Sequence, residues 1–341
     1  MKSFYECSFF DQRLALKGQK NLDFVVTQEE IHLSGKAGVN NFSFSKKTID
    51  YRCSYVKGDR FDHSKPTIII PIKDNVTLLK ITIQNLSQRK VLESCNLFVV
   101  DDRTCNNEIK DATIQVGASY IKVDNNKGFN FSMLNNIASK VVHELGCETI
   151  IFWNSDLWTP DEETVPQLLL KHKLSGSTLS GTKLIYPPIE FSLNGEADSE
   201  NIISNFPSMT KGRWRNTVQF GGTAFRGTEP YHVYRFRQSS DPRVNCETGC
   251  NMITGAFQIW DLPRFIEIGG FNPSLSKNYQ DNDVCLRLLE RNLIPMYFGK
   301  DLFLFHDESP SLMKEGKQDR QIYSDHVLFH KLWDQKLLTL F

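Results

Sequence analysis

The chain has 341 residues, and its 40 basic and 40 acidic side chains give a formal net charge of zero. This length suits one large α/β domain with attachments, or two modest domains. The balanced charge argues against a general nucleic-acid-binding protein and leaves room for a local cationic pocket. No apolar run approaches the roughly 18 residues of a membrane span, and the first residues lack the apolar core of a secretion signal. We therefore expect a soluble, cytoplasmic protein.

The eight cysteines are scattered, without the density or regular spacing of a secreted disulfide scaffold. Cys246 and Cys250 are the closest pair, but no second pair of Cys or His residues nearby completes a structural zinc site. We expect reduced thiols.

The first 62 residues contain alternating stretches, such as LDFVVTQEEIHLSG, that predict a few β-strands or a small sheet ahead of the main fold. From Thr67 the pattern changes: TIIIPI and NLFVVDD predict buried strands on either side of NVTLLKITIQNLSQ, which has helical spacing. The segments ASYIKVDN, FSMLNNIASKVVHEL and ETIIFW continue as strand, helix and strand. Strands that alternate with helices predict an α/β fold, with a mostly parallel central sheet flanked by helices.

Acidic residues follow three of these strands. Asp74 comes after TIIIPI, Asp102 ends NLFVVDD, and Asp156 follows the apolar strand in TIIFWNSDLW. Because open α/β sheets bind ligands beyond the carboxyl ends of their parallel strands, we expect these carboxylates to gather at one edge. A single solvated loop acid would be the simpler reading of Asp156 alone.

The second half of the chain begins with residues 187–245, which show no sustained period and predict long loops with short strands. The segment TGCNMITGAFQIW predicts one strand. In QDNDVCLRLLERN, helical spacing places Asp281 and Asp283 at the N-terminal end of a helix, where we expect one of them to act as the cap. Two acids after a glycine-rich turn also suit a general base that faces a reactive centre.

The segment LFLFH predicts a further strand, with His306 at its end. Asp156 and His306 together offer one oxygen and one nitrogen to a divalent cation, whose other positions stay open to phosphate oxygens and water. Such mixed ligation suits Mn²⁺ or Mg²⁺. A lone histidine is more often a core or surface residue, so this prediction depends on the aspartate lying beside it.

Six segments resemble, in order and spacing, those of a known family: TIIIPIKDNVTLL, LFVVDD, NNKGFNFSMLNNIAS, IIFWNSD, GGFNPSLSKNYQDNDVCLRL and LFHDESPS. The family is that of the bacterial family 2 glycosyltransferases of the GT-A fold, in the branch that builds O-antigen, capsule and cell-wall polysaccharides. The resemblance covers roughly residues 66–311 and implies a nucleotide-sugar donor, a divalent metal and inversion at the anomeric carbon.

By this resemblance, residues 154–156 correspond to the DxD-type motif of the family, with Asp156 as the metal-binding acid. His306 corresponds to a second contact to the metal or the diphosphate. Asp281 corresponds to the catalytic base, and Asp283 to a supporting acid.

The resemblance also implies a donor-binding set, in which Asp102 hydrogen-bonds the base of the nucleotide. The whole set is Pro71, Ile72, Asp74, Asp102, Asn135, Asn154 and Ser155. Two departures from the family pattern concern this region and the catalytic base. Arg103 and Thr104 replace a usual pair of small residues, and Gln280 stands where Glu or Asn is frequent.

We therefore expect an inverting, metal-dependent hexosyltransferase or N-acetylhexosaminyltransferase, with a UDP-sugar donor and a glycan or lipid-linked acceptor. The expected organisation is a β-rich N-terminal extension (residues 1–62), a GT-A domain (63–311, divided at 186 into donor and acceptor halves) and a helical C-terminal extension (312–341). The C-terminal segment YSDHVLFHKLWDQKLL is expected to pack on the domain. Dimerisation and docking on the inner face of the cell membrane also stay open for it.

Two other function classes stay open. A sugar nucleotidyltransferase would share the sheet, the nucleotide and the metal, but no glycine-rich phosphate loop with a following basic residue comes after the first strand. A catalytically inactive glycosyltransferase-like binding module is the other class. The joint presence of Asp156, Asp281 and His306 argues against it.

Overall fold

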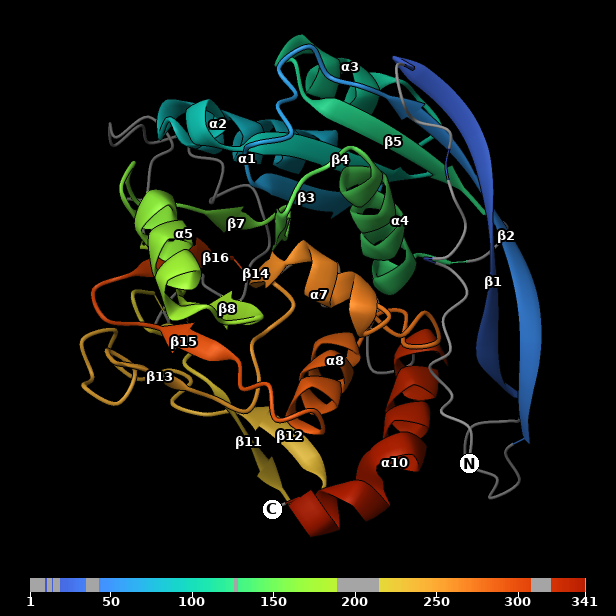
Figure 1. Ribbon diagram of the computed structural model, residues 1–341. Helices are drawn as coiled ribbons and strands as arrows, with labels where there is room; N and C mark the ends of the chain where they lie inside the picture. The colour runs from blue at the N-terminus through green and yellow to red at the C-terminus, as the bar shows by residue number, and fades with distance from the viewer. Residues whose placement is uncertain are drawn as a thin grey trace.

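The computed structural model describes residues 10, 14, 19–34, 43–125, 128–188, 215–307 and 320–340. The strands of these residues form sheets of ten, four and two strands. In Figure 1 the ten-stranded sheet runs from the long hairpin β1–β2, at the right of the view, to β15 and β13 at the left.

Four neighbouring strands at the centre of this sheet run parallel, in the order β5–β4–β3–β6. They are rich in β-branched and aromatic residues and almost wholly buried, as strands covered on both faces are. Their bounds are Ser119–Asp124 (β5), Asn96–Asp102 (β4), Thr67–Ile72 (β3) and Thr149–Trp153 (β6).

Helices connect these strands: α1 (Val76–Gln88), α2 (Val91–Ser94), α3 (Glu108–Gln115) and α4 (Phe131–Glu144). The side chains of Asn75 and Asn130 accept hydrogen bonds from backbone N–H groups in the first turns of α1 and α4, and so cap both helices.

The chain passes from β3 to β4 and β5, and then returns to β6 on the other side of β3. Because such crossovers are right-handed, α3 and α4 lie on opposite faces of the sheet (Figure 1). The reversal of direction falls between β3 and β6, and it marks the crevice beyond their carboxyl ends as the expected ligand site. The predicted α/β fold, with parallel central strands flanked by helices, is confirmed.

Short strands extend the sheet beyond β6, where β14 runs antiparallel to both β6 and β8. The bounds are Phe257–Asp261 (β14), Leu179–Gly181 (β8), Met296–Phe298 (β15) and Glu247–Gly249 (β13), and α7 (Leu262–Glu267) follows β14. The single strand predicted for TGCNMITGAFQIW is therefore wrong. The segment forms β13 at the sheet's edge and β14 beside β6, because residues 250–256 turn between them.

The predicted N-terminal strands form the antiparallel pair β1 (Asn21–Ser34) and β2 (Ser43–Val56). They extend the central sheet, since β2 pairs with β5, and they do not make a sheet of their own. The domain boundaries expected at residues 62, 186 and 311 stay predictions.

A second sheet has the order β10–β9–β16–β7, with bounds Val218–Phe220, Lys183–Ile185, Phe303–His306 and Leu157–Trp158. It packs on α1 through a small apolar cluster made of Leu78, Ile81, Trp158, Ile185 and Phe305. In this sheet β7, which begins directly after Asp156, pairs with β16, which ends at His306. The hairpin β11 (Thr223–Arg226) and β12 (Glu229–His232) forms the two-stranded sheet.

The C-terminal half ends in α8 (Gln280–Leu289) and α10 (Arg320–Leu340). Leu328, Phe329, Trp333 and Leu337 of α10 are buried in the main core, so the expected packing of this helix on the domain is confirmed. Among the described residues, no helix combines the length and the apolar character needed to cross a membrane.

A buried histidine makes the stability of this fold depend on pH. His172, on α5 (Thr164–Ser175), is 6% exposed, and its Nδ1 lies 2.8 Å from the Ser180 hydroxyl oxygen. Burial lowers the pKa of His172 from 6.5 to about 4. The folded state therefore favours the neutral imidazole ring. The contribution of His172 to the free energy of unfolding is present above pH 6.5 and is lost as the pH falls from 6.5 through 4.

We expect the wild type to lose about 2 kcal/mol of unfolding free energy between pH 7 and pH 5 through His172 alone. Urea denaturation at the two pH values measures this loss, and His172→Gln should show a pH-dependent loss that is smaller by that amount. Equal losses in the two proteins would refute the assignment.

Candidate functional site

Asp156 and His306 lie side by side, although they are far apart in the sequence. Asp156 Oδ1 is 3.4 Å from His306 Nε2, and the two side chains are 4% and 8% exposed. The pairing of Leu157 with His306 fixes this arrangement, and the Asp307 N–H donates to the Asp156 carbonyl at 3.1 Å. Asp156 Oδ2 is buried and makes no hydrogen bond within the part of the chain that the structure describes. Such a buried acceptor is costly unless a cation or donor completes it.

Asp281 is linked to the same loop by the turn 254–256. Its Oδ2 accepts the Gly255 N–H at 2.8 Å, and the next carbonyl, of Ala256, accepts the Asn154 N–H at 3.0 Å. A Cβ at Gly255 would lie 3.3 Å from the Asp281 Cβ, so the close approach favours glycine. Two hydrogen bonds, through Gly255 and Ala256, thus connect the half-buried Asp281 to the loop that carries Asp156.

The start of α8 differs from the expectation that an aspartate caps it. The N-cap residue is Tyr279, which has a φ of 63° and makes no side-chain capping bond, so neither Asp281 nor Asp283 is the cap. Both acids lie in the first turn, where free N–H groups and the helix dipole stabilise negative charge. Asp281 Oδ1 accepts the Asn282 N–H at 2.8 Å. The cap therefore lies two positions before Asp281, the nearer of the two expected caps.

Asp283 is not brought to this site. Its fully buried carboxylate accepts hydrogen bonds from Arg287 Nε at 2.9 Å and from Trp333 Nε1 at 3.0 Å. Arg287 also donates to the carbonyls of Ile268 and Gly270, at 2.6 Å each. These contacts tie α8 to α10 and to the turn after α7, which is a structural role.

Asp102, at the end of β4, makes hydrogen bonds through one carboxylate oxygen and an ion pair through the other. Its Oδ1 accepts hydrogen bonds from Arg103 Nε at 3.2 Å and Asn125 Nδ2 at 3.3 Å, while Lys73 Nζ lies 3.8 Å from Oδ2. Burial raises the pKa of Asp102, and the charges of Arg103 and Lys73 oppose that shift. Oδ2 is buried without a hydrogen bond in the described residues, and Lys73 is its ion-pair partner.

The other residues expected around the nucleoside differ in their access to a ligand. Pro71 and Ile72 are buried within β3, whereas Asp74 is exposed just beyond it. Asp74 has a φ of 55°, and its N–H donates to the Thr104 hydroxyl at 3.1 Å. Thr104, one of the two departures from the family pattern, therefore supports the loop after β3.

Asn154 and Ser155 are half-buried between β6 and β7, and the Thr82 hydroxyl on α1 donates to the Ser155 carbonyl at 2.5 Å. The side chain of Asn135 is completely buried in α4 and donates to the Phe131 carbonyl at 2.9 Å.

The donor atoms around Asp156 fit a divalent cation. A carboxylate oxygen and an imidazole nitrogen at 3.4 Å have the spacing of two neighbouring ligands of one ion, and the second carboxylate oxygen has no hydrogen bond among the described residues.

Sequence reasoning missed several residues of this region: Lys73, Thr82, Gly255 and Asp307. Asp307 was the easiest of these to predict, because it follows His306 in the segment LFHDESPS. Its side chain is buried, with 2% of its surface exposed. Thr82 and Gly255 act through a hydroxyl and a backbone N–H, for which the sequence carries no signal.

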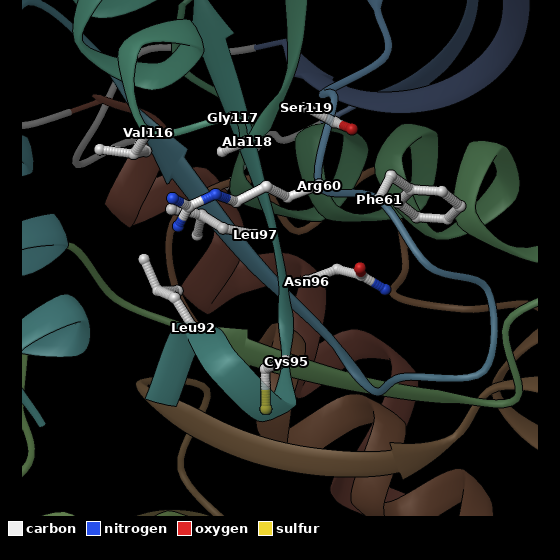
Figure 2. Close-up of a pocket in the computed structure, with 10 residues that line it drawn as sticks. All are labelled: Arg60, Phe61, Leu92, Cys95, Asn96, Leu97, Val116, Gly117, Ala118 and Ser119. Atoms are coloured by element: carbon white, nitrogen blue, oxygen red, sulfur yellow. The ribbon is translucent and has the colours of Figure 1, made fainter. Parts of the chain in front are cut away.

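A small pocket lies at the opposite edge of the sheet (Figure 2). It has a volume of about 20 Å³ and is lined by residues such as Arg60, Asn96 and Gly117, near the starts of β4 and β5. This volume holds one or two water molecules at most, so the pocket does not accommodate a nucleotide.

Comparison with known proteins gives no family model that matches the chain. An uncharacterised protein of Sinorhizobium fredii, y4gI, is 24% identical over 229 residues. That match covers 65% of this chain and 22% of the relative, so the chain spans less than a quarter of that protein's length.

Three solved structures resemble the chain over most of its length. The first is a mannosyltransferase of Pyrobaculum calidifontis in complex with GDP-Man and Mn²⁺, with 11% identity and a TM-score of 0.44; the match covers 83% of this chain and 74% of that one. The second is TarS residues 1–349 of S. aureus, with 10% identity and a TM-score of 0.43; the match covers 80% of this chain and 73% of that one. The third is a CMP:2-keto-3-deoxy-manno-octonic acid synthetase with CTP (12%, 0.38, 74% and 96%). All three TM-scores lie below 0.5, so the functional assignment rests on the residues of this chain.

The two acids of α8 should differ sharply in their effect on stability. Asp283→Ala leaves the buried Arg287 charge without its carboxylate and should cost about 3–5 kcal/mol of unfolding free energy. Asp281→Asn, at a half-exposed position, should cost about 1 kcal/mol or less. Urea denaturation measures both, and equal losses would contradict the structural role of Asp283.

Proposed function

We propose that the chain is an inverting, metal-dependent glycosyltransferase of the GT-A type, which transfers a sugar from a nucleoside diphosphate to an acceptor hydroxyl. The observation that carries this proposal is the buried pair Asp156–His306 at the switch point of the sheet, linked to Asp281 by the turn 254–256. Metal-binding groups and a separate carboxylate are what a sugar-diphosphate transfer requires at one site.

The nucleoside half of the donor is expected beyond β3 and β4. Asp102 Oδ2 is a buried acceptor for an N–H group of the base, and Arg103 and Asn125 hold the carboxylate in place through Oδ1. Asp74 lies exposed at the same edge. Lys73, 3.8 Å from Asp102, adds positive charge where an anionic nucleotide would lie.

The diphosphate is expected next to Asp156 and His306. These two residues would hold Mn²⁺ or Mg²⁺, whose charge stabilises the negative charge that develops on the departing diphosphate. The fold already shields the Asp156 carboxylate from water, so it attracts positive charge more strongly than an exposed acid does.

Asp281 is the proposed general base. The N–H groups of Gly255 and Asn282 orient its carboxylate, and the half-exposed side chain remains reachable by an acceptor. An acceptor hydroxyl is too weak an acid to attack unaided, so Asp281 takes its proton as the new glycosidic bond forms. UDP-hexose or UDP-N-acetylhexosamine as donor, and a glycan or lipid-linked glycan of a surface polysaccharide as acceptor, are part of this proposal.

A panel of UDP-, GDP- and dTDP-sugars with Mn²⁺, assayed by nucleotide release, tests the activity. Asp281→Asn should lower kcat by about 10²–10⁴-fold and leave donor affinity nearly unchanged, because the base acts only in the chemical step. Asp59→Asn, at a side chain 75% exposed, is the matched control and should keep full activity. Unchanged turnover in Asp281→Asn would remove the base assignment, and donor binding without turnover throughout the panel would favour a binding module.

The metal dependence is tested separately by calorimetry. UDP, GDP or dTDP should bind the wild type more tightly with Mn²⁺ than with a chelator, and Asp156→Ala should abolish that difference. His306→Gln should weaken the effect. Nucleotide binding that ignores both the chelator and these substitutions would contradict the assignment of Asp156 and His306 as metal ligands.

A further inference from the structure

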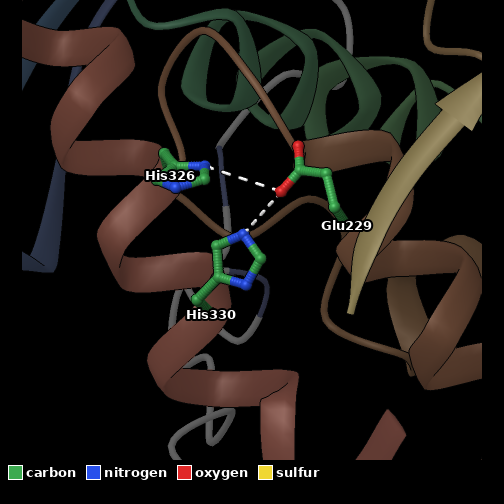
Figure 3. A group of neighbouring side chains, drawn as sticks. All are labelled: Glu229, His326 and His330. Carbon is green, nitrogen blue, oxygen red and sulfur yellow. Dashed lines mark hydrogen bonds and ion pairs between the residues drawn. The ribbon is translucent and has the colours of Figure 1, made fainter. Parts of the chain in front are cut away.

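Glu229, His326 and His330 form a second cluster of metal-binding groups, distinct from the pair Asp156–His306 (Figure 3). The two histidines lie one helical turn apart on α10, and Glu229 is the first residue of β12. Glu229 Oε2 lies 2.8 Å from His330 Nε2 and 3.9 Å from His326 Nδ1. Figure 3 shows the carboxylate pointing toward both rings.

Neighbouring groups orient two of these three residues. Asp334 Oδ1 lies 2.7 Å from His330 Nδ1, which directs the other ring nitrogen toward Glu229. The Tyr279 hydroxyl donates to Glu229 Oε1 at 2.9 Å and leaves Oε2 directed to the histidines. A carboxylate behind a histidine, and a donor behind a ligating carboxylate, are the supporting contacts that metal sites share.

We propose that Glu229, His326 and His330 bind Zn²⁺, with water as the remaining ligand. A tetrahedral zinc ion with bonds of about 2.0–2.2 Å keeps its ligand atoms roughly 3.3 Å apart. The observed 2.8 and 3.9 Å bracket that spacing, and all three ligand atoms lie within 4.8 Å of one another, so side-chain adjustments can complete the site. Two imidazole ligands and one carboxylate suit zinc better than Mn²⁺ or Mg²⁺.

His326 Nδ1 and Glu229 Oε2 are 3.9 Å apart, too far for a direct hydrogen bond, and the Tyr279 hydroxyl oxygen lies 2.8 Å from His326 Nδ1. A proton on His330 Nε2 can bridge to Glu229. An ion that replaces the protons on the two histidine nitrogens would contact all three groups directly. The side chains of Glu229 and His326 are 49% and 45% exposed, so the ion can enter from solvent.

The site would join three parts of the fold near the proposed base. Tyr279, which contacts Glu229 and lies 2.8 Å from His326 Nδ1, precedes α8, whose first turn carries Asp281. Asp325, next to His326, accepts the backbone N–H groups of Lys277 and Asn278 at 2.6 and 3.0 Å. Zinc there stabilises the docking of α10 against β12 and the start of α8.

Zinc titration of the full chain, freed of metal with a chelator, tests this proposal. Isothermal titration with ZnCl₂ should show one more equivalent of tightly bound zinc in the wild type than in His326→Gln/His330→Gln. Asp156 and His306 are present in both proteins, so their contribution cancels. Zinc should also raise the Tm of the wild type by more than that of the double variant.

The matched control is His63→Gln/His143→Gln, which removes two exposed histidines elsewhere and should bind zinc as the wild type does. Asp334→Asn should weaken zinc binding by about 10- to 100-fold. Should the histidine double variant fail to fold, Glu229→Gln, at a half-exposed side chain, should lose the same equivalent. Equal stoichiometry and affinity in the wild type and Glu229→Gln would overturn the proposal.

Discussion

The candidate site depends on the pairing of β7 with β16. This pairing sets Leu157 opposite His306 and so places Asp156 and the imidazole together inside the protein. The side chains of Trp158 and Phe305, on the same two strands, are buried against α1, which keeps the short strands in place. The Asp156 carboxylate, which water would otherwise solvate, is thereby held desolvated, and its Oδ2 makes no hydrogen bond among the described residues.

The site draws its position from the order of the parallel strands. The chain reverses direction between β3 and β6, and the loops after these strands, with the end of β4, supply Asp74, Asp102 and Asp156. A small pocket of about 20 Å³ lies at the opposite edge of the sheet. The concentration of acidic groups at one edge therefore follows from topology and does not require any single strong motif.

Much of the donor half could be predicted from the sequence, because its strands are continuous apolar runs and its helices α1 and α4 have clear periodicity. Helix α3, which is short and weakly apolar, was not predicted. The expectation that an aspartate caps α8 was wrong because Tyr279 adopts a left-handed conformation at that position. The strands β13, which contains a glycine, and β14, which is apolar, were predicted as one strand. The structure distinguishes them because β13 pairs with β15 and β14 pairs with β6.

Contacts between distant segments were the least predictable part of the site. Asp281 and Asp283 occur two residues apart, yet one faces Gly255 and the other faces Trp333 of α10. Similarly, the spacing of His326 and His330 is visible in the sequence, while their neighbour Glu229 is recognisable only from the structure. About half a helical turn thus separates the proposed base, Asp281, from Asp283, whose carboxylate is occupied by structural contacts.

The most direct test of a metal-assisted transferase is to locate Mn²⁺ by its anomalous scattering in crystals grown with Mn²⁺ and a nucleoside diphosphate. The account predicts a peak within bonding distance of Asp156 and the diphosphate, beside His306, with the base of the nucleotide near Asp102. A nucleotide bound at another edge of the sheet, or manganese bound without contact to Asp156, would contradict it.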